Sequence, residues 1–299
     1  MKTLLRLTRP LHLLLAALTY FLGASIADYL GKSVCIIVGF ALFLCNNLFW
    51  LGLVGVILAQ TSMNLLAEVF RLDVEPLQEN ETRKDRRTLR NNALYVSIAA
   101  LTAVALIIYL LNQISPLSPQ TFLLFLVSLL FILAYSTPPF RFVNRGFGEF
   151  ILAAHIAYVI PSLAFVLQIG ETHRLLTVTM PLTFLGFAYF IALNFPSFAS
   201  DQKYERVTFL TRLGWERVVP LHNIFIVFAY IFLALSPSFG LSFSLIWPAF
   251  LTLPFAMFQI YQLRNIALGA RVNWTLLSAT ALSVFGLTAY FITMTFWRH

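Results

Sequence analysis

Long, uninterrupted apolar segments are the feature that most constrains the fold of this chain of 299 residues. A helix that crosses the hydrocarbon core of a bilayer, about 30 Å thick, needs about 20 apolar residues. Because the runs are continuous rather than alternating at every second residue, they indicate membrane helices rather than membrane strands. We therefore expect an all-α integral membrane bundle of nine transmembrane helices. The segments that qualify are 10–30, 46–70, 93–113, 119–136, 148–169, 176–196, 217–236, 241–263 and 274–297.

The composition agrees with a membrane protein. Hydrophobic residues make up 60% of the chain and charged residues only 11%, whereas a soluble domain carries about 25% charged residues. The mean hydropathy of +0.83 leaves too little polar surface to face water, which excludes a soluble enzyme and a disordered chain. The apolar stretch 33–45 is too short to span alone, so we expect a half-helix or an extension of the second span. Cys35 and Cys45 are expected to be buried, reduced thiols.

The net charge of +8 indicates topology rather than nucleic-acid binding, since cytoplasmic loops of membrane proteins collect Lys and Arg. With a cytoplasmic N-terminus, 17 of the 20 Lys and Arg residues lie on the cytoplasmic side, together with ten of the 12 Asp and Glu residues. We therefore predict a multi-pass protein of the cell membrane and no nucleic-acid partner. The chain 1–299 is expected to form a single domain, with the polar segment 72–91 as a partly helical cytoplasmic cap.

Polar residues gather at the cytoplasmic ends of the second and sixth spans. Asn64, Glu68 and Glu75 are separated by four and seven residues, so they share one face if the helix continues that far. Asn194 and Asp201 are seven residues apart and share a face in the same way. Each group pairs an amide at the membrane edge with carboxylates one or two turns further out. An ordinary solvated, salt-bridged loop is the alternative interpretation.

Two facing carboxylate clusters at the mouth of a helix bundle suit Mg²⁺, a hard cation that takes a few carboxylates and leaves positions for phosphate oxygens. The neighbouring Lys and Arg side chains would hold a diphosphate. Below them the aromatic and apolar helix walls would accommodate an isoprenoid tail. The pattern therefore predicts a polyprenyl diphosphate as substrate.

Three segments at these positions resemble the UbiA superfamily of intramembrane prenyltransferases. They are Asn64 to Glu68 with the downstream run Arg87 to Arg90, then Tyr135 to Glu149, and then Asn194 to Gly214. Within that superfamily the chain is most similar to the 1,4-dihydroxy-2-naphthoate polyprenyltransferases of menaquinone biosynthesis. The resemblance implies transfer of a polyprenyl group from a polyprenyl diphosphate to an aromatic acceptor, with Mg²⁺ bridging the diphosphate and two Asp-rich motifs.

The Asp-rich motifs are degenerate in this chain. Ala67, Glu68, Arg71 and Glu75 stand at the places of the first motif, and Ser197 replaces the first aspartate of the second, so that only Asp201 remains. One metal ion held by Glu68 and Asp201 is the resulting hypothesis, with Arg71 taking over part of the diphosphate charge.

The candidate site follows from the pattern and the resemblance together. The predicted catalytic residues are Asn64, Glu68, Asp73, Asn194 and Asp201. The predicted Mg²⁺ ligands are Glu68, Glu75 and Asp201. The predicted diphosphate-binding residues are Arg71, Lys84, Arg87, Arg141, Arg145, Lys203 and Arg206. Tyr135 and His155 are placed in the acceptor or prenyl pocket, with an interhelical hydrogen bond as the alternative role of His155.

Two alternative functions stay open at this point. A membrane terpene cyclase would use the same allylic-cation chemistry without an aromatic acceptor. A non-catalytic homologue would bind an isoprenoid lipid and release no diphosphate. Neither the prenyl chain length nor the acceptor is specified by the sequence.

Overall fold

Local sequence signals start the membrane helices where the apolar runs begin. Pro10 occupies the first turn of helix α2 and Pro119 that of α5, where a missing N–H costs nothing. The side chain of Asn46 accepts the backbone N–H of Phe49 and caps α3. Thr82 and Asp85 form a reciprocal capping box at the start of α4.

The computed structural model describes residues 2–38, 42–75, 77 and 82–298. Within these residues nine helical segments are long and apolar enough to cross a membrane, which confirms the predicted all-α membrane bundle. The third segment begins ten residues before the predicted span, because α4 continues beyond the apolar run. The nine segments are Pro10–Tyr29, Asn47–Val69, Arg83–Ile114, Pro119–Ser136, Gly148–Ile169, Arg174–Asn194, Trp215–Phe239, Phe243–Ala267 and Trp274–Arg298.

Four of the segments are single helices and five are composite. The single ones are α2 (Pro10–Tyr29), α3 (Asn47–Val69), α4 (Arg83–Ile114) and α5 (Pro119–Ser136). The α-helices of the composite ones are α6 (Gly148–Ala154), α7 (Ile160–Ile169), α8 (Thr179–Asn194), α11 (Trp215–Leu235), α12 (Phe243–Ile246), α13 (Leu253–Ala267), α14 (Trp274–Leu282) and α15 (Thr288–Arg298). Short helices outside the spans are α1 (Lys2–Leu7), α9 (Phe198–Lys203) and α10 (Phe209–Leu213).

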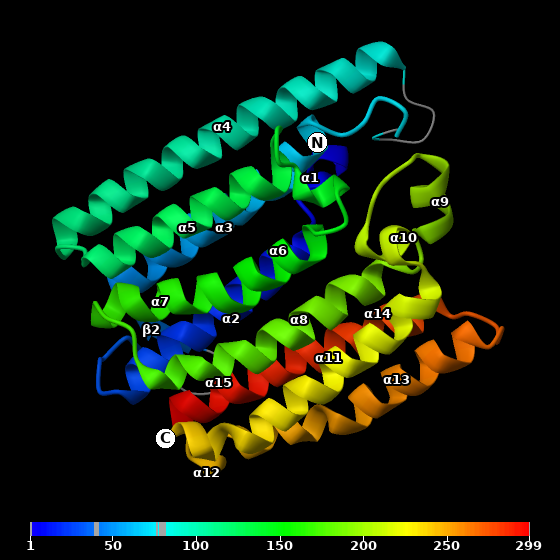
Figure 1. Ribbon diagram of the computed structural model, residues 1–299. Helices are drawn as coiled ribbons and strands as arrows, with labels where there is room; N and C mark the ends of the chain where they lie inside the picture. Colours follow the sequence, from blue (N-terminus) through cyan, green and yellow to red (C-terminus); the bar gives the residue numbers. More distant parts are fainter. Residues whose placement is uncertain (1, 39–41, 76, 78–81, 299) are drawn as a thin grey trace.

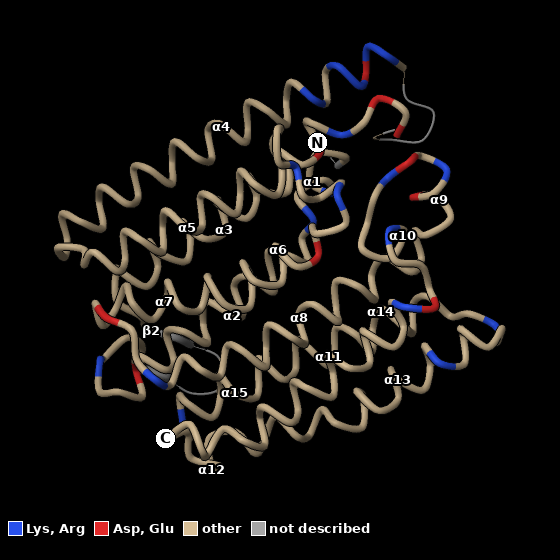
Figure 2. The backbone as a smooth tube through the Cα atoms, in the orientation of Figure 1, with Lys and Arg blue, Asp and Glu red and all other residues tan. Residues whose placement is uncertain are grey.

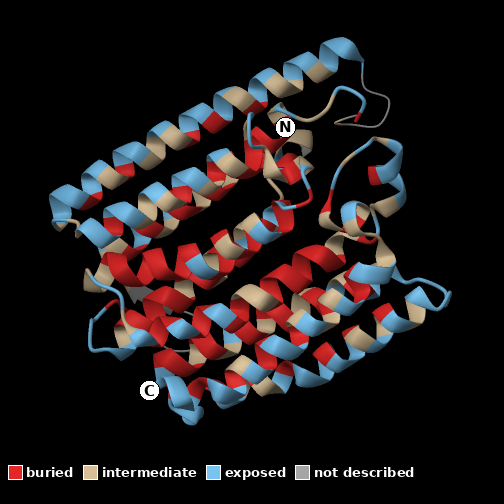
Figure 3. Cartoon of the chain, viewed as in Figure 1, coloured by how far each residue is buried: buried red, intermediate tan, exposed pale blue. Residues whose placement is uncertain are grey.

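The helices form two halves that meet along α2, α7 and α8 (Figure 1). Helix α3 packs on α4 and α5, α2 packs on α3, α7 and α15, and α8 packs on α6 and α11. Burial follows this arrangement: α7 and α8 are almost wholly buried, whereas α4 buries few of its apolar side chains (Figure 3). Exposed apolar side chains on a membrane helix face lipid, so the peripheral helices define the lipid contact.

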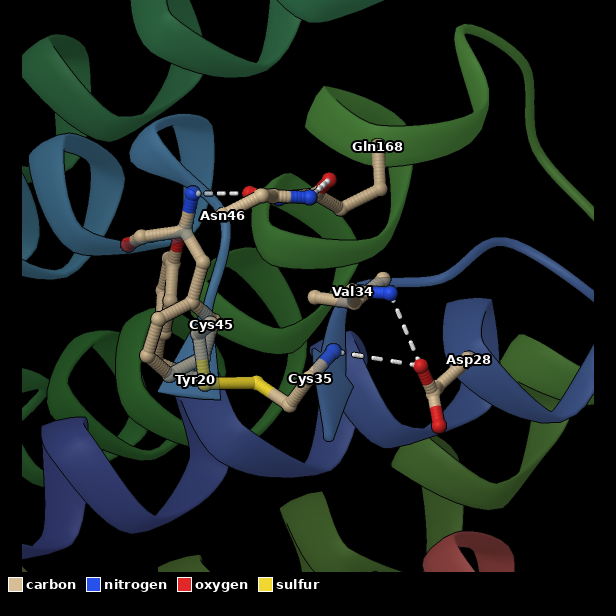
Figure 4. Close-up of a disulfide and its surroundings, with 8 residues drawn as sticks. Tyr20, Asp28, Val34, Cys35, Cys45, Asn46 and Gln168 are labelled. Atoms are coloured by element: carbon tan, nitrogen blue, oxygen red, sulfur yellow. Dashed lines mark hydrogen bonds between the residues drawn. A yellow bond between two sulfur atoms is a disulfide. The ribbon is translucent and has the colours of Figure 1, made fainter. Parts of the chain in front are cut away.

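The expected half-helix at 33–45 is wrong. Strands β1 (Cys35–Val38) and β2 (Leu42–Cys45) pair antiparallel, with Cys35 directly opposite Cys45. Residues 39–41, between the strands, lie outside the described residues. The two cysteines form a disulfide rather than free thiols (Figure 4). The sequence gives no spacing motif for this bond, which results from the register that places the two residues opposite each other.

Ionisable residues are distributed unevenly along the bundle. Most of them lie at the end of the bundle that carries α1, α9, α10 and the start of α4 (Figure 2). Part of the predicted cap, residues 76 and 78–81, lies outside the described residues. The preceding turn packs against α4, because Arg86 donates hydrogen bonds to the carbonyls of Leu72, Asp73 and Glu75.

Candidate functional site

The last turn of α3 carries a buried carboxylate between two arginines. Arg9 Nη2 lies 2.8 Å from Glu68 Oε1, and Arg71 Nε lies 2.7 Å from Glu68 Oε2. Arg71 Nη1 also lies 3.4 Å from Glu75 Oε1. Helix α3 ends at Val69, so Glu75 approaches from the following turn and not, as expected, from a continued helical face. The two carboxylates are therefore joined through a guanidinium group.

A third arginine extends this arrangement to α9. Arg206 Nη1 lies 3.7 Å from Glu75 Oε1 and 3.8 Å from Asp201 Oδ1. Ser197 donates a hydrogen bond of 2.8 Å to Asp201. We call the alternating series Arg9, Glu68, Arg71, Glu75, Arg206 and Asp201 the charged network.

Burial and neighbouring groups shift the pKa of three residues at this site that lie outside the membrane segments. Burial raises the pKa of Asp201 above its ordinary value, and Arg206 opposes that shift. Burial alone would lower the pKa of Arg9, but Tyr135 and Glu68 outweigh it and raise the pKa. Arg9 therefore remains a cation at the entrance of α2. The pKa of Arg141 is lowered, mainly by burial.

The charged network does not fit a Mg²⁺ cage. No group of three His, Cys, Asp or Glu side chains among the described residues is placed to hold an ion. Glu68 and Glu75 share Arg71, and Glu75 and Asp201 share Arg206. A hard cation needs carboxylate oxygens that it can coordinate directly, and here guanidinium groups occupy the space between them. The three predicted ligands therefore meet in the network, but as ion-pair partners.

Four arginines line a small hollow within the charged network. Arg9, Arg71, Arg141 and Arg206 line it together with the carboxylates of Glu68 and Glu75. Arg141 comes from the turn after α5, where its backbone is left-handed with φ of 39°. Three of these arginines were predicted from the sequence. Arg9 was counted only as a topological charge and is the one that was missed.

A larger cavity, about 230 Å³, adjoins the hollow and shares Arg9, Val143 and Arg206 with it. Its polar lining includes Tyr135, whose hydroxyl accepts a hydrogen bond of 3.3 Å from Arg9. The cavity is lined by Arg9, His12, Tyr135, Val143, Gly148, Glu149, Leu152, Phe190, Leu193, Asn194, Ser197, Arg206 and Thr208. We call it the polar cavity. It combines hydrogen-bonding groups with apolar walls.

Asn194 faces Glu149 and not Asp201. Its amide donates to Glu149 Oε1, which also accepts the backbone N–H of Phe209 at 3.0 Å. The second carboxylate oxygen of Glu149 has no hydrogen-bond partner within the described part of the chain. Glu149 was not among the predicted site residues. The available signal was an acid at the first turn of a membrane span, directly after Gly148.

The polar end of α2 supplies a further residue that the sequence analysis missed. His12 lines the polar cavity and lies 3.4 Å from Asn64 Oδ1 through its Nδ1 atom. Asn64 is fully buried, and its side-chain amide donates a hydrogen bond of 2.8 Å to the carbonyl oxygen of Thr8. The available signal was a histidine two residues after Pro10, at the point where the first span begins.

Several predicted residues lie elsewhere. Lys84 and Arg87 are exposed on the first turns of α4, and Lys203 is exposed on α9. Asp73 pairs with Arg90 at 2.8 Å, outside the charged network. Arg145 is exposed and donates to the carbonyl of Pro139.

His155 is not among the residues that line the polar cavity. It is buried between helices, with Nδ1 3.0 Å from Gln60 and Nε2 2.9 Å from Ser128. This is the interhelical hydrogen bond that the sequence analysis left open as the alternative. Ser128 in turn borders an apolar cavity of about 370 Å³ between α3, α4 and α5.

Comparison with known proteins gives a family and a fold. The family model described as the UbiA prenyltransferase family matches residues 44–277. Among solved structures, the chain is similar to that from a study of digeranylgeranylglyceryl phosphate synthase in membranes, with a TM-score of 0.64 and 15% identity over 99% of this chain and 97% of that one. It is also similar to a UbiA homologue from Archaeoglobus fulgidus bound to Cd²⁺, with a TM-score of 0.52 and 14% identity over 98% and 99%. Comparison with curated proteins finds no match.

Proposed function

Because the chain belongs to the UbiA prenyltransferase family, we propose that it transfers a polyprenyl group from a polyprenyl diphosphate to a lipophilic aromatic acceptor. The acceptor class we propose is a quinone precursor such as 1,4-dihydroxy-2-naphthoate, which places the reaction in menaquinone biosynthesis. The observation that carries the proposal is the convergence of Arg9, Arg71, Arg141 and Arg206 on one hollow beside the polar cavity. Arginine presents a planar fork of donors that matches phosphate oxygens.

The charges at the hollow suit a diphosphate. Four guanidinium groups face two carboxylates there, so the site keeps an excess of positive charge. A bound diphosphate would compete with Glu68 and Glu75 for Arg71, since both ion pairs are formed by the same side chain. Hydrogen-bond donors already aimed at the leaving oxygens stabilise the charge that develops as the allylic C–O bond breaks.

The polar cavity suits the acceptor. Its walls include Leu152, Phe190 and Leu193, which would pack against a flat ring, and its polar groups include Tyr135 and Glu149. Because the cavity adjoins the hollow, an aromatic carbon there would lie beside the prenyl carbon that loses diphosphate. Holding the two partners in this way replaces a bimolecular encounter by a positioned reaction.

Magnesium dependence rests on the sequence pattern and the resemblance, and the geometry does not support it. The charged network offers guanidinium groups where the family motifs would offer metal ligands, so no step of the proposed reaction is assigned to a metal ion. We assign the neutralisation of the diphosphate to the arginines. Mg²⁺ dependence stays a prediction from the sequence, tested by adding Mg²⁺ or a chelator.

We place the site on the cytoplasmic side of the membrane. The segregation of 17 of 20 basic residues to one side supports this orientation. The disulfide supports it as well, because Cys45 precedes the first residue of α3 whereas Glu68 lies in its last turn, and disulfides persist in oxidising compartments. The segment 72–91 is proposed to cap the mouth of the site and exclude water from the allylic cation.

The test is diphosphate release from geranylgeranyl diphosphate by the purified protein in lipid nanodiscs, with and without 1,4-dihydroxy-2-naphthoate. We expect release that requires the acceptor. Release without acceptor would favour a terpene cyclase. If no diphosphate is released with donors of several chain lengths and several aromatic acceptors, the proposal is contradicted, and a non-catalytic homologue that binds isoprenoid lipids is favoured.

A further inference from the structure

A chain of buried hydrogen bonds runs from the backbone at Thr8 into the membrane bundle. The carbonyl of Thr8 can only accept, so the group of Asn64 that faces it at 2.8 Å must be the amide nitrogen. The Oδ1 atom of Asn64 is thereby turned toward Gln60 and His12. One backbone carbonyl therefore fixes the orientation of the Asn64 amide.

The orientation of Asn64 fixes the tautomer of His12. Oδ1 can only accept, so His12 Nδ1, 3.4 Å away, must carry the hydrogen. A neutral imidazole has one ring hydrogen, which leaves a lone pair on Nε2. That nitrogen has no hydrogen-bond partner within the described residues, although the histidine is only 7% exposed. His12 lines the polar cavity beside Tyr135.

Phe190 limits how the ring can turn. It lies edge-on to the His12 imidazole, with the ring centroids 5.3 Å apart and the planes at 83°. The residue is therefore held by a hydrogen bond on one side and an aromatic contact on the other. A buried base with a fixed tautomer and a free lone pair is prepared to accept a proton from a ligand in the cavity.

We propose that His12 Nε2 is the base that removes the proton from the aromatic acceptor, and that Asn64 is the positioning residue that holds its tautomer. The proposal rests on the proposed prenyl transfer. The C–O bond of the donor breaks and its electron pair leaves with the diphosphate. A π electron pair of the acceptor ring forms the new C–C bond. The C–H bond at that ring carbon then breaks, its electrons restore the aromatic ring, and the proton moves to Nε2.

The other candidate bases are engaged or inaccessible. Glu149 Oε1 accepts hydrogen bonds from Asn194 and Phe209, and its second oxygen, although it has no hydrogen-bond partner within the described residues, is buried without accessible surface. The same argument of orientation makes His155 a satisfied member of the chain: Gln60 Oε1 accepts from its Nδ1, and its Nε2 accepts from Ser128. His12 is thus the base whose lone pair is free and whose ring borders the polar cavity.

The tautomer is tested without turnover, by nitrogen NMR of ¹⁵N-histidine-labelled protein in lipid bilayers. The chain has five histidines, and the signal lost in His12→Gln identifies His12. We expect a neutral ring protonated at Nδ1 in the wild type. In Asn64→Leu the hydrogen-bond acceptor is gone, so the Nε2–H tautomer should appear. An Nε2–H tautomer in the wild type would overturn the assignment.

The base is tested by kinetics of His12→Gln with geranylgeranyl diphosphate and 1,4-dihydroxy-2-naphthoate. General-base catalysis contributes about 10²- to 10⁴-fold, so we expect kcat to fall by that factor while the affinity for the donor is unchanged. Proton removal should then limit the rate, and an acceptor deuterated at the reacting carbon should show a primary isotope effect on kcat that the wild type lacks. Asn64→Leu should lower kcat in the same direction without changing donor affinity.

His222→Gln is the matched control, because it makes the same substitution at a buried histidine that packs between α11 and α13 and contacts Gln259. We expect wild-type kcat and no isotope effect. An unchanged kcat in His12→Gln, or a loss of donor affinity without an isotope effect, would overturn the role of His12 alone. A wild-type protein that transfers no prenyl group would instead contradict the proposed function, and the base with it, while the NMR result would still decide the tautomer.

Discussion

Arg71→Ala tests the arginine-based diphosphate site most sharply. Arg71 is the side chain shared by Glu68 and Glu75, at 2.7 and 3.4 Å. Among the described residues, its removal leaves Glu68 paired with Arg9 at 2.8 Å and Glu75 paired with Arg206 at 3.7 Å. The loss of stability should therefore stay below the roughly 3–5 kcal/mol that accompanies an orphaned buried charge. The protein is expected to fold.

The effect on the donor should be larger than the effect on folding. A hydrogen bond to a charged group contributes about 1.5–3 kcal/mol, and each 1.4 kcal/mol is a factor of ten in affinity. Arg71→Ala should thus weaken the binding of geranylgeranyl diphosphate by about 10- to 150-fold. Arg71→Lys should recover only part of the loss, because an ammonium group lacks the planar fork.

The assay is a dissociation constant for the donor, measured in nanodiscs by competition with a fluorescent prenyl diphosphate, together with kcat/KM. Arg83→Ala is the matched control, since Arg83 is an exposed arginine at the first position of α4. We expect its donor affinity to equal that of the wild type. Wild-type affinity in Arg71→Ala, or an equal loss in Arg83→Ala, would refute the reasoning.

Further predictions concern the metal, the aromatic pocket, the helix packing and the disulfide. Binding of the donor should persist in EDTA, because the guanidinium groups of the hollow carry the positive charge; strict dependence of binding on Mg²⁺ would contradict this. Tyr135→Phe should lower donor affinity only about 2- to 12-fold, since it removes one hydrogen bond of 3.3 Å from Arg9, worth about 0.5–1.5 kcal/mol. Gly23→Ala should destabilise the bundle by at least about 1–3 kcal/mol, because its Cβ would lie 1.9 Å from the carbonyl oxygen of Pro161; a thermal melt of the nanodisc-embedded protein measures it. Cys35→Ser should lower the melting temperature, with a loss of about 2–4 kcal/mol, and should make Cys45 reactive to a maleimide without prior reduction.

The membrane fold could be predicted because it depends on the hydropathy of contiguous residues. The fourth and fifth spans match the observed segments at 119–136 and 148–169. The start of α4 was placed ten residues late for a physical reason. Its first turns at Arg83 are polar and lie beyond the apolar run, and they are specified by the Thr82 cap rather than by hydropathy.

The candidate site was only partly visible in the sequence because its contacts connect distant segments. Arg9 meets Glu68, 59 residues away, and Gln60 meets His155, 95 residues away. No spacing rule for one helix contains these pairs. The sequence analysis also found no signal that ends α3 at Val69, so it placed Glu75 on the face of a helix that continues beyond that residue.

The sequence analysis identified the three carboxylates of the charged network, but it predicted them as metal ligands and not as ion-pair partners of arginines. Glu68, Glu75 and Asp201 were selected by charge and helical spacing, which cannot show that Arg71 and Arg206 lie between them. Ser197 was interpreted from the resemblance as the replacement of an aspartate, which stays a prediction; in the structure it donates a hydrogen bond to Asp201.

The most direct test of prenyl transfer is mass spectrometry of the lipid extract after incubation with geranylgeranyl diphosphate and 1,4-dihydroxy-2-naphthoate. The account predicts an acceptor that has gained one geranylgeranyl group in place of one ring hydrogen, formed by the wild type and strongly reduced in Arg71→Ala. Recovery of unchanged donor and acceptor, or of a cyclised hydrocarbon alone, would contradict it.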